Sequence, residues 1–148
     1  MKKQTIKKSI DIKAPKEKVW SILLEDKFTR IWYNEFCVGA HAETDWKIGS
    51  TALFKDESES GLAGKIIVNK PNEKISVEYE GLVIAGVEDY ESEGAKNVKG
   101  GRETYILLEK DGSTDLSIEC DMAPVYFESM SSAWEKALRK IKLMSEAT

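Results

Sequence analysis

The chain has 148 residues, and its content of 41% hydrophobic and 32% charged residues is that of a folded globular protein and excludes an intrinsically disordered one. This length corresponds to one domain, so we expect residues 1–148 to form a single unit. The net charge of -4 lacks the basic surplus of nucleic-acid-binding and membrane-surface proteins, so we expect neither nucleic acid nor membrane as a partner.

The chain contains no apolar run long enough to cross a bilayer, and its basic first residues are not followed by the apolar stretch of a secretory signal. We therefore expect a cytoplasmic protein. In that reducing compartment Cys37 and Cys120 are expected to be buried or half-buried free thiols rather than a disulfide. Nothing in the sequence specifies an oligomeric state.

The first part of the chain predicts one strand and two short helices. Isoleucines alternate with polar residues over residues 5–13, which is typical of a half-buried strand. Pro15 suits the first position of a helix over residues 15–24, because its φ is preset and that position needs no N–H donor. Asp26 is a good N-cap for a second short helix over residues 26–33.

The middle of the chain predicts a series of strands. Asp111-Gly112 is a strong signal for a two-residue hairpin turn, and residues 56–61 and 70–73 have the composition of turns. Residues 81–101 break the alternating pattern and are predicted to be irregular. The segments predicted as strands are residues 36–40, 51–55, 63–69, 74–80, 102–109 and 114–122.

The last element is a long amphipathic helix over residues 127–144. Its apolar side chains fall on one stripe at helical spacing, and such a stripe must pack against another layer. Because the preceding elements are strands joined by short turns, the plainest arrangement is a curved antiparallel sheet wrapped around this helix. The predicted fold class is therefore α+β.

Several motifs occur along the chain in a characteristic order and spacing. They are Ala14-Pro15 with Val19-Trp20, Trp46 with Gly49-Ser50, Gly64-Lys65-Ile66 with Pro71, Gly86-Val87-Glu88-Asp89 with Ser92, Glu103 with Tyr105 and Leu107, and Gly112-Ser113-Thr114 with Leu116. Together they resemble the helix-grip superfamily of START and birch-pollen-allergen domains, and within it stand-alone proteins related to the C-terminal domain of the heat-shock-protein-90 ATPase activator. The resemblance implies a seven-stranded antiparallel sheet that grips the last helix, two small helices at one end, a cavity between helix and sheet, and a chaperone as a potential partner.

The inner wall of such a grip provides the candidate ligand-binding residues. We expect an apolar small molecule to bind there, although the same side chains are equally suited to fill a solid core. The candidates are Trp32, Phe36, Val38, Phe54, Ile66, Val77, Tyr79, Tyr105, Leu107, Met130 and Trp134.

Glu103 and Tyr105 are the weak catalytic candidates. They lie two residues apart on one predicted strand and so share a face. If that face points inward, a carboxylate beside a phenol in an apolar cavity suits general acid/base chemistry. The alternation also permits the opposite inner set, which contains Arg102, Thr104, Ile106 and Leu108.

Metal and cofactor motifs are missing from the sequence. His41 is the only histidine, and its separation along the strand from Cys37 is too great for both to bind one metal ion. We therefore predict no metal site and no cofactor. Residues 81–101 are expected to form either a lid over the cavity or a surface excursion that covers a sheet edge.

The sequence supports three hypotheses for function. The leading one is a small binding protein for an apolar or amphipathic molecule held between the last helix and the sheet. The second is a co-chaperone or protein-interaction module, as the resemblance implies. The third is an enzyme of the cyclase or hydrolase kind that uses Glu103 and Tyr105.

Overall fold

The computed structural model describes residues 3–147, so residues 1, 2 and 148 of the predicted domain lie outside it. The elements follow in the order β1 (Gln4–Ile12), α1 (Lys16–Leu24), α2 (Asp26–Trp32), η1 (Tyr33–Glu35), β2 (His41–Glu43), β3 (Thr51–Lys55), β4 (Gly61–Lys70), β5 (Lys74–Ile84), β6 (Val87–Asp89), α3 (Glu93–Val98), β7 (Arg102–Lys110), β8 (Ser113–Met122), η2 (Pro124–Tyr126) and α4 (Phe127–Glu146).

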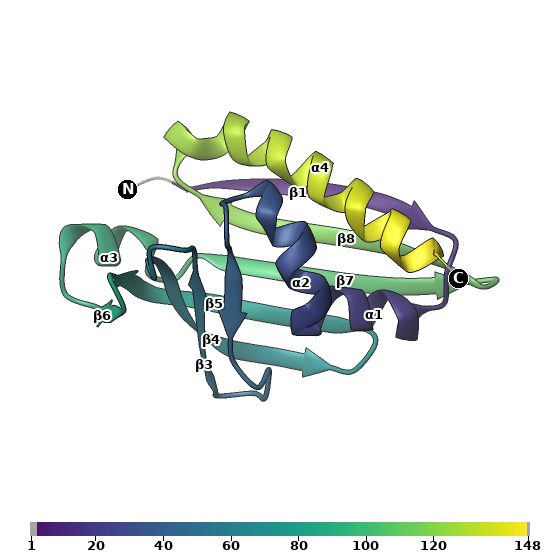
Figure 1. Cartoon of the computed structure of the whole chain (residues 1–148), viewed down its shortest axis with the longest axis horizontal. Helices are drawn as coiled ribbons and strands as arrows, with labels where there is room; N and C mark the ends of the chain where they lie inside the picture. The colour runs from purple at the N-terminus through teal and green to yellow at the C-terminus, as the bar shows by residue number, and fades with distance from the viewer. Residues whose placement is uncertain (1–2, 148) are drawn as a thin grey trace.

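The strands form one antiparallel sheet in the order β1-β8-β7-β5-β4-β3-β2, and the short β6 pairs with the end of β5. Shifts in register between β4 and β5, at Ala63/Gly64 and Ile66/Val68, mark bulges of the kind that bend a sheet. The sheet curves around α4, which lies across one face, with α1 and α2 beside it (Figure 1). This is the α+β helix-grip fold predicted from the sequence.

The core lies between the sheet, α4 and the two short helices. Leu138 and Ile141 on α4 are buried and belong to the same cluster as Leu23 of α1. Opposite them, Ile12 and Leu116 from β1 and β8 are fully buried. Burial of this shared apolar surface is what holds the helix on the sheet.

The predicted turns have the expected chemistry. Asp111 and Gly112 both have positive φ, at 53° and 81°, and they join β7 directly to β8. A two-residue turn with this backbone matches the right-handed twist of its strands. β3 and β4 are joined across residues 56–60, and β4 and β5 across residues 71–73, as predicted.

Four local predictions were wrong. Residues 36–40 form turns instead of a strand, because Gly39 takes φ 76° and its N–H bonds to the side chain of Asn34. Pro15, predicted at the first helical position, is instead the N-cap of α1, which begins at Lys16. Asp26, predicted as an N-cap, is the first residue of α2, and Glu25 is its N-cap. Residues 81–101 are largely regular, since β5 continues to Ile84 and β6 and α3 follow.

None of the helices within residues 3–147 combines the length and the apolar composition that a bilayer crossing needs. Both cysteines are free thiols, as predicted. Cys120 is buried, as predicted. The predicted burial of Cys37 was wrong, because this residue lies in the turns that replace the predicted strand and is exposed.

Candidate functional site

A cavity of about 670 Å³ lies between the N-terminal half of α4 and the sheet. Its wall combines η1, the strands β3, β5, β7 and β8, and the helix α3. The side chains and backbone around it come from Lys3, Trp32, Tyr33, Phe36, Cys37, Ala40, His41, Phe54, Lys55, Asp56, Ser60, Gly61, Leu62, Tyr79, Leu82, Gly94, Asn97, Val98, Gly101, Glu103, Tyr105, Cys120, Asp121, Met122, Ala123, Val125, Tyr126, Met130 and Trp134.

Seven of the eleven ligand-binding candidates line this cavity. They are Trp32, Phe36, Phe54, Tyr79, Tyr105, Met130 and Trp134. Ile66, Val77 and Leu107 are buried in the core and do not reach the cavity wall. Val38 was placed wrongly on the inner face, because it lies in a turn and is 65% exposed.

The cavity ends where α4 meets the short helices. Toward the C-terminus of α4, Leu138 and Ile141 pack against the sheet and α1 and are not part of the cavity wall. Toward its N-terminus, only Met130 and Trp134 of this helix face the cavity. The helix therefore has a packed half and a half that borders open space.

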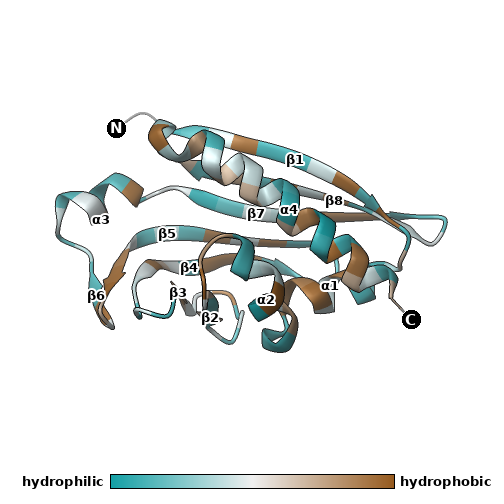
Figure 2. Ribbon diagram, turned by 45° about the horizontal axis from the view of Figure 1, so that its top comes forward, coloured by the Kyte–Doolittle hydropathy of each residue, from teal (hydrophilic) through white to brown (hydrophobic). Residues whose placement is uncertain are grey.

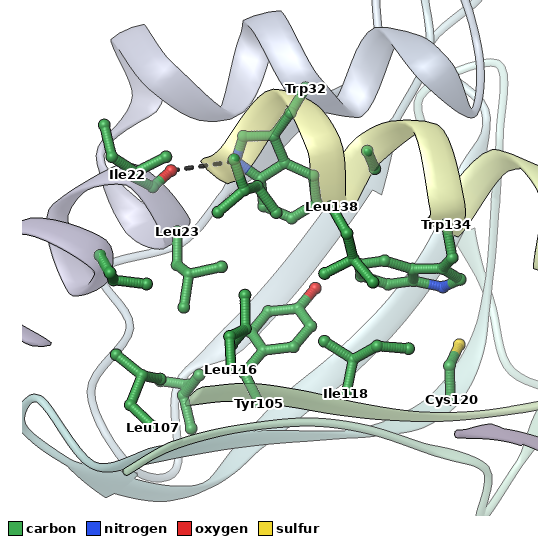
Figure 3. Packing of buried hydrophobic residues seen from close by; sticks show 14 of the residues in the cluster. Ile22, Leu23, Trp32, Tyr105, Leu107, Leu116, Ile118, Cys120, Trp134 and Leu138 are labelled. Atoms are coloured by element: carbon green, nitrogen blue, oxygen red, sulfur yellow. Dashed lines mark hydrogen bonds between the residues drawn. The ribbon is translucent and has the colours of Figure 1, made fainter. Parts of the chain in front are cut away.

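Four aromatic rings form one cluster at the inner end of the cavity. Trp134 lies at its centre, with ring centroids 4.9 Å from Phe36, 5.8 Å from Tyr105 and 5.9 Å from Trp32. The indole N–H of Trp32 donates to the carbonyl oxygen of Ile22 at 2.9 Å, which fixes the ring against α1 (Figure 3). These rings give the cavity a rigid apolar wall.

Glu103 is the polar centre of this wall. Its carboxylate accepts hydrogen bonds from the Tyr79 hydroxyl at 2.8 Å, from the Tyr105 hydroxyl and from the Cys120 thiol at 3.4 Å. The cross-strand register explains the arrangement, since Glu103 on β7 faces Val77 of β5 and Cys120 of β8. Glu103 and Tyr105 thus share the inner face, and the alternative inner set is excluded.

Burial raises the pKa of the Tyr79 and Tyr105 hydroxyls well above the usual value, and the negative charge of Glu103 raises each pKa further. The pKa of the Cys120 thiol is raised for the same two reasons. All three groups are therefore protonated donors at neutral pH. A thiol in this state is a poor nucleophile. The site can bind polar groups, and it offers no activated nucleophile among these groups.

Two buried donors near the cluster have no hydrogen-bond partner within residues 3–147. They are the Tyr33 hydroxyl and the Trp134 indole N–H. Burial also raises the pKa of the Tyr33 hydroxyl well above its usual value, with the charge of Glu103 as a smaller cause, so this group too keeps its proton. In Figure 3 the indole nitrogen of Trp134 lies on the side of the ring toward Cys120.

The segment 81–101 forms one edge of the cavity. Leu82 of β5 and Gly94, Asn97 and Val98 around α3 all line it. The helix α3 in this segment is capped by Ser92, whose hydroxyl accepts the Ala95 N–H at 3.2 Å. Sequence reasoning missed these wall residues, although Asp89 and Ser92 before a short apolar pattern are a recognisable helix-start signal.

Sequence reasoning also missed a polar cluster at the cavity rim. The structure brings His41 together with Glu43 and Glu59, whereas the sequence compared His41 only with the two cysteines. The ammonium group of Lys55 bonds Glu43 at 2.9 Å and Glu59 at 2.7 Å and already supplies their positive counter-charge. We therefore assign no metal to this cluster.

A curved antiparallel sheet that grips a C-terminal helix, with an apolar cavity between them, defines the class as a helix-grip protein of the START-like kind. The family follows from the sequence match. Residues 13–146 match the family described as "Activator of Hsp90 ATPase homolog 1-like protein", and the chain belongs to this family. No curated protein matches the chain.

Solved structures share the fold at low sequence identity. Protein MLL2253 from Mesorhizobium loti superposes with a TM-score of 0.73 at 14% identity, over 95% of this chain and 96% of that one. Protein CV1439 from Chromobacterium violaceum gives 0.68 at 18% identity, over 98% and 99% of the two chains. The Aha1 dimer from Colwellia psychrerythraea gives 0.67 at 17% identity, over 94% and 93%. These likenesses establish the fold alone.

Proposed function

We propose that this protein is a cytoplasmic binding protein for an apolar or amphipathic small molecule, held between α4 and the sheet. The observation that carries the proposal is the cavity of about 670 Å³ with its wall of aromatic rings. Small-molecule sites are typically about 300–1,000 Å³, mostly apolar, with a few placed polar groups. Glu103, Tyr79 and Tyr105 are such groups here.

The direct test uses a neutral probe whose fluorescence rises in apolar surroundings, N-phenyl-1-naphthylamine. We expect saturable binding with one site per chain. Met130→Trp adds bulk where α4 borders the cavity and should abolish that binding. Leu143→Trp places the same ring on the exposed side of the same helix, where Leu143 is 69% exposed, and should leave binding unchanged. Equal binding by both variants would place the probe elsewhere and overturn the proposal.

A second candidate is a co-chaperone role, which the family description favours. Hydrophobic residues gather at the tip where β5 turns into β6 (Figure 2), and Ile84 and Val87 there are 54% and 68% exposed. Exposed apolar groups of this kind suit contact with another protein. The test measures the ATPase rate of Hsp90 at saturating protein, with the Ile84→Ser and Val87→Ser double variant as the comparison. An unchanged rate with the native chain rejects this candidate.

A further inference from the structure

The carboxylate of Glu103 is flanked inside the cavity by neutral groups. Its three hydrogen-bond donors are two phenols and one thiol. Within residues 3–147, no Lys, Arg or His nitrogen lies within 4.0 Å of it. A half-buried carboxylate normally has a positive partner, because removal of a charge from water is costly. In this cavity the position of such a positive partner beside Glu103 is open to a group of a ligand.

The other charges on the cavity wall are already engaged at its rim. Lys3 donates to the carbonyl oxygen of Lys99 at 2.7 Å, and Lys55 bonds two glutamates. Asp121 accepts the Thr5 hydroxyl at 2.5 Å and the Arg102 N–H at 3.0 Å. Asp56 likewise accepts the N–H groups of its own hairpin loop. Glu103 is therefore the charge that a ligand inside the aromatic wall would meet.

The aromatic cluster adds a second attraction for positive charge. Phe36 is the half-buried ring of this cluster on the cavity wall that Glu103 also lines, whereas Trp32, Tyr105 and Trp134 are at most 3% exposed. The face of an aromatic ring carries partial negative charge and attracts an ammonium group, most strongly where water is excluded. A carboxylate beside such rings is the chemistry that recognises an organic cation with an apolar body.

We propose that the cavity selects ligands that carry an ammonium group on an apolar or aromatic body, with Glu103 as the counter-ion. This inference rests on the proposed small-molecule binding and names its ligand class. A ligand carboxylate is disfavoured at the same place, because it would face Glu103. The rival is a neutral ligand whose carbonyl accepts from the buried donors of Tyr33 and Trp134.

The experiment compares four naphthalene derivatives of similar size as competitors of N-phenyl-1-naphthylamine at neutral pH. They are the amine 2-(aminomethyl)naphthalene, the alcohol 2-naphthalenemethanol, the ketone 2-acetonaphthone and the acid 2-naphthoic acid. We expect the amine to bind about tenfold more tightly than the alcohol, since a charge-assisted hydrogen bond is roughly twice as strong as a neutral one. The acid should bind most weakly.

Glu103→Gln keeps the size of the side chain and an acceptor for the tyrosines and removes the charge. In this variant the affinity for the amine should fall to that for the alcohol, while the affinity for the alcohol should change by less than about twofold. Glu119→Gln is the matched control, because Glu119 lies on neighbouring β8, outside the cavity wall. It should leave the amine preference intact. Thermal unfolding checks that both variants are folded.

Each result decides the matter. If the neutral probe binds but the amine is not preferred, or the preference survives Glu103→Gln, the ammonium inference is overturned and the binding function stands. A preference for the ketone supports the rival. If the neutral probe and all four competitors fail to bind, both proposals fall. The native selectivity needs no variant, so it tests the inference even if Glu103→Gln does not fold.

Discussion

The two halves of α4 should differ sharply in what a truncation costs. Leu138 is 4% exposed and packs in the solid part of the core. Met130 is half-buried and borders the cavity. Both are long apolar side chains on one helix, so replacement of each by alanine removes a similar amount of chain. What differs is whether the surroundings are already hollow.

The magnitudes follow from burial. Leu138→Ala removes three buried carbon groups, worth about 2.4 kcal/mol of transfer free energy, and it also opens a new void, for a total of about 3–4 kcal/mol. Met130→Ala loses roughly half of that transfer free energy and opens almost no new void, so its cost is about 1 kcal/mol. For a domain of this size the difference of about 2 kcal/mol corresponds to roughly 4–8 °C in Tm.

Urea denaturation followed by tryptophan fluorescence and circular dichroism measures both free energies of unfolding. Thermal unfolding provides the second measurement. Equal losses for the two variants would show that the space beside Met130 is packed as tightly as the core around Leu138. The hollow beside the N-terminal half of α4 would then not exist.

Two further predictions concern buried polar groups. Tyr33, Tyr79 and Tyr105 have raised pKa values in the folded protein, so their stabilising contribution is complete below the unfolded value near 10 and is lost as pH rises above it. Above pH 10 the free energy of unfolding should then fall by about 1.4 kcal/mol per pH unit for each of these tyrosines. Phenolate absorbance should appear together with unfolding, and phenolate formation near pH 10 in the intact fold would contradict this prediction. Thr114→Val should cost about 1–3 kcal/mol in urea denaturation, because the buried Thr114 hydroxyl donates to the carbonyl oxygen of Ala14 at 2.8 Å. The same change at exposed Thr51 should cost less than about 0.5 kcal/mol. Equal losses of unfolding free energy for the two variants would show that the hydrogen bond of Thr114 does not stabilise the fold.

Most of the fold was predictable because it rests on local periodicity and turn chemistry. The stripe on α4 and the Asp111-Gly112 turn each have one favourable structure. The predicted strand over residues 36–40 failed because Gly39 and the side chain of Asn34 form a turn, which hydrophobic alternation does not report. The extension of β5 to Ile84 was missed for a related reason. Its glycine, Gly81, lies where an added Cβ would come within 2.4 Å of the Asp89 carbonyl oxygen, so the residue that looks like a strand breaker permits the pairing with β6.

The sequence predicted which strands carry the residues of the candidate site, but it did not predict whether these residues enclose a cavity. Spacing placed Glu103 and Tyr105 on one face, but both faces of β7 carry apolar residues, so the choice of the inward face depended on tertiary packing. Cys120 joins the polar cluster only through the cross-strand register with Glu103. Whether aromatic side chains fill a space or border it depends on volumes summed over many elements, and periodicity carries no such information.

The division of α4 into a packed half and a hollow half separates two demands that many proteins place on the same residues. Anchoring the helix falls to Leu138, Ile141 and the buried Trp134, whereas Met130 is half-buried and borders the cavity. If the cavity binds a ligand as proposed, changes at Met130 would draw little on the free energy that keeps the chain folded. One scaffold can in this way acquire new chemical preferences by single substitutions, each of which leaves a stable protein on which the next can act.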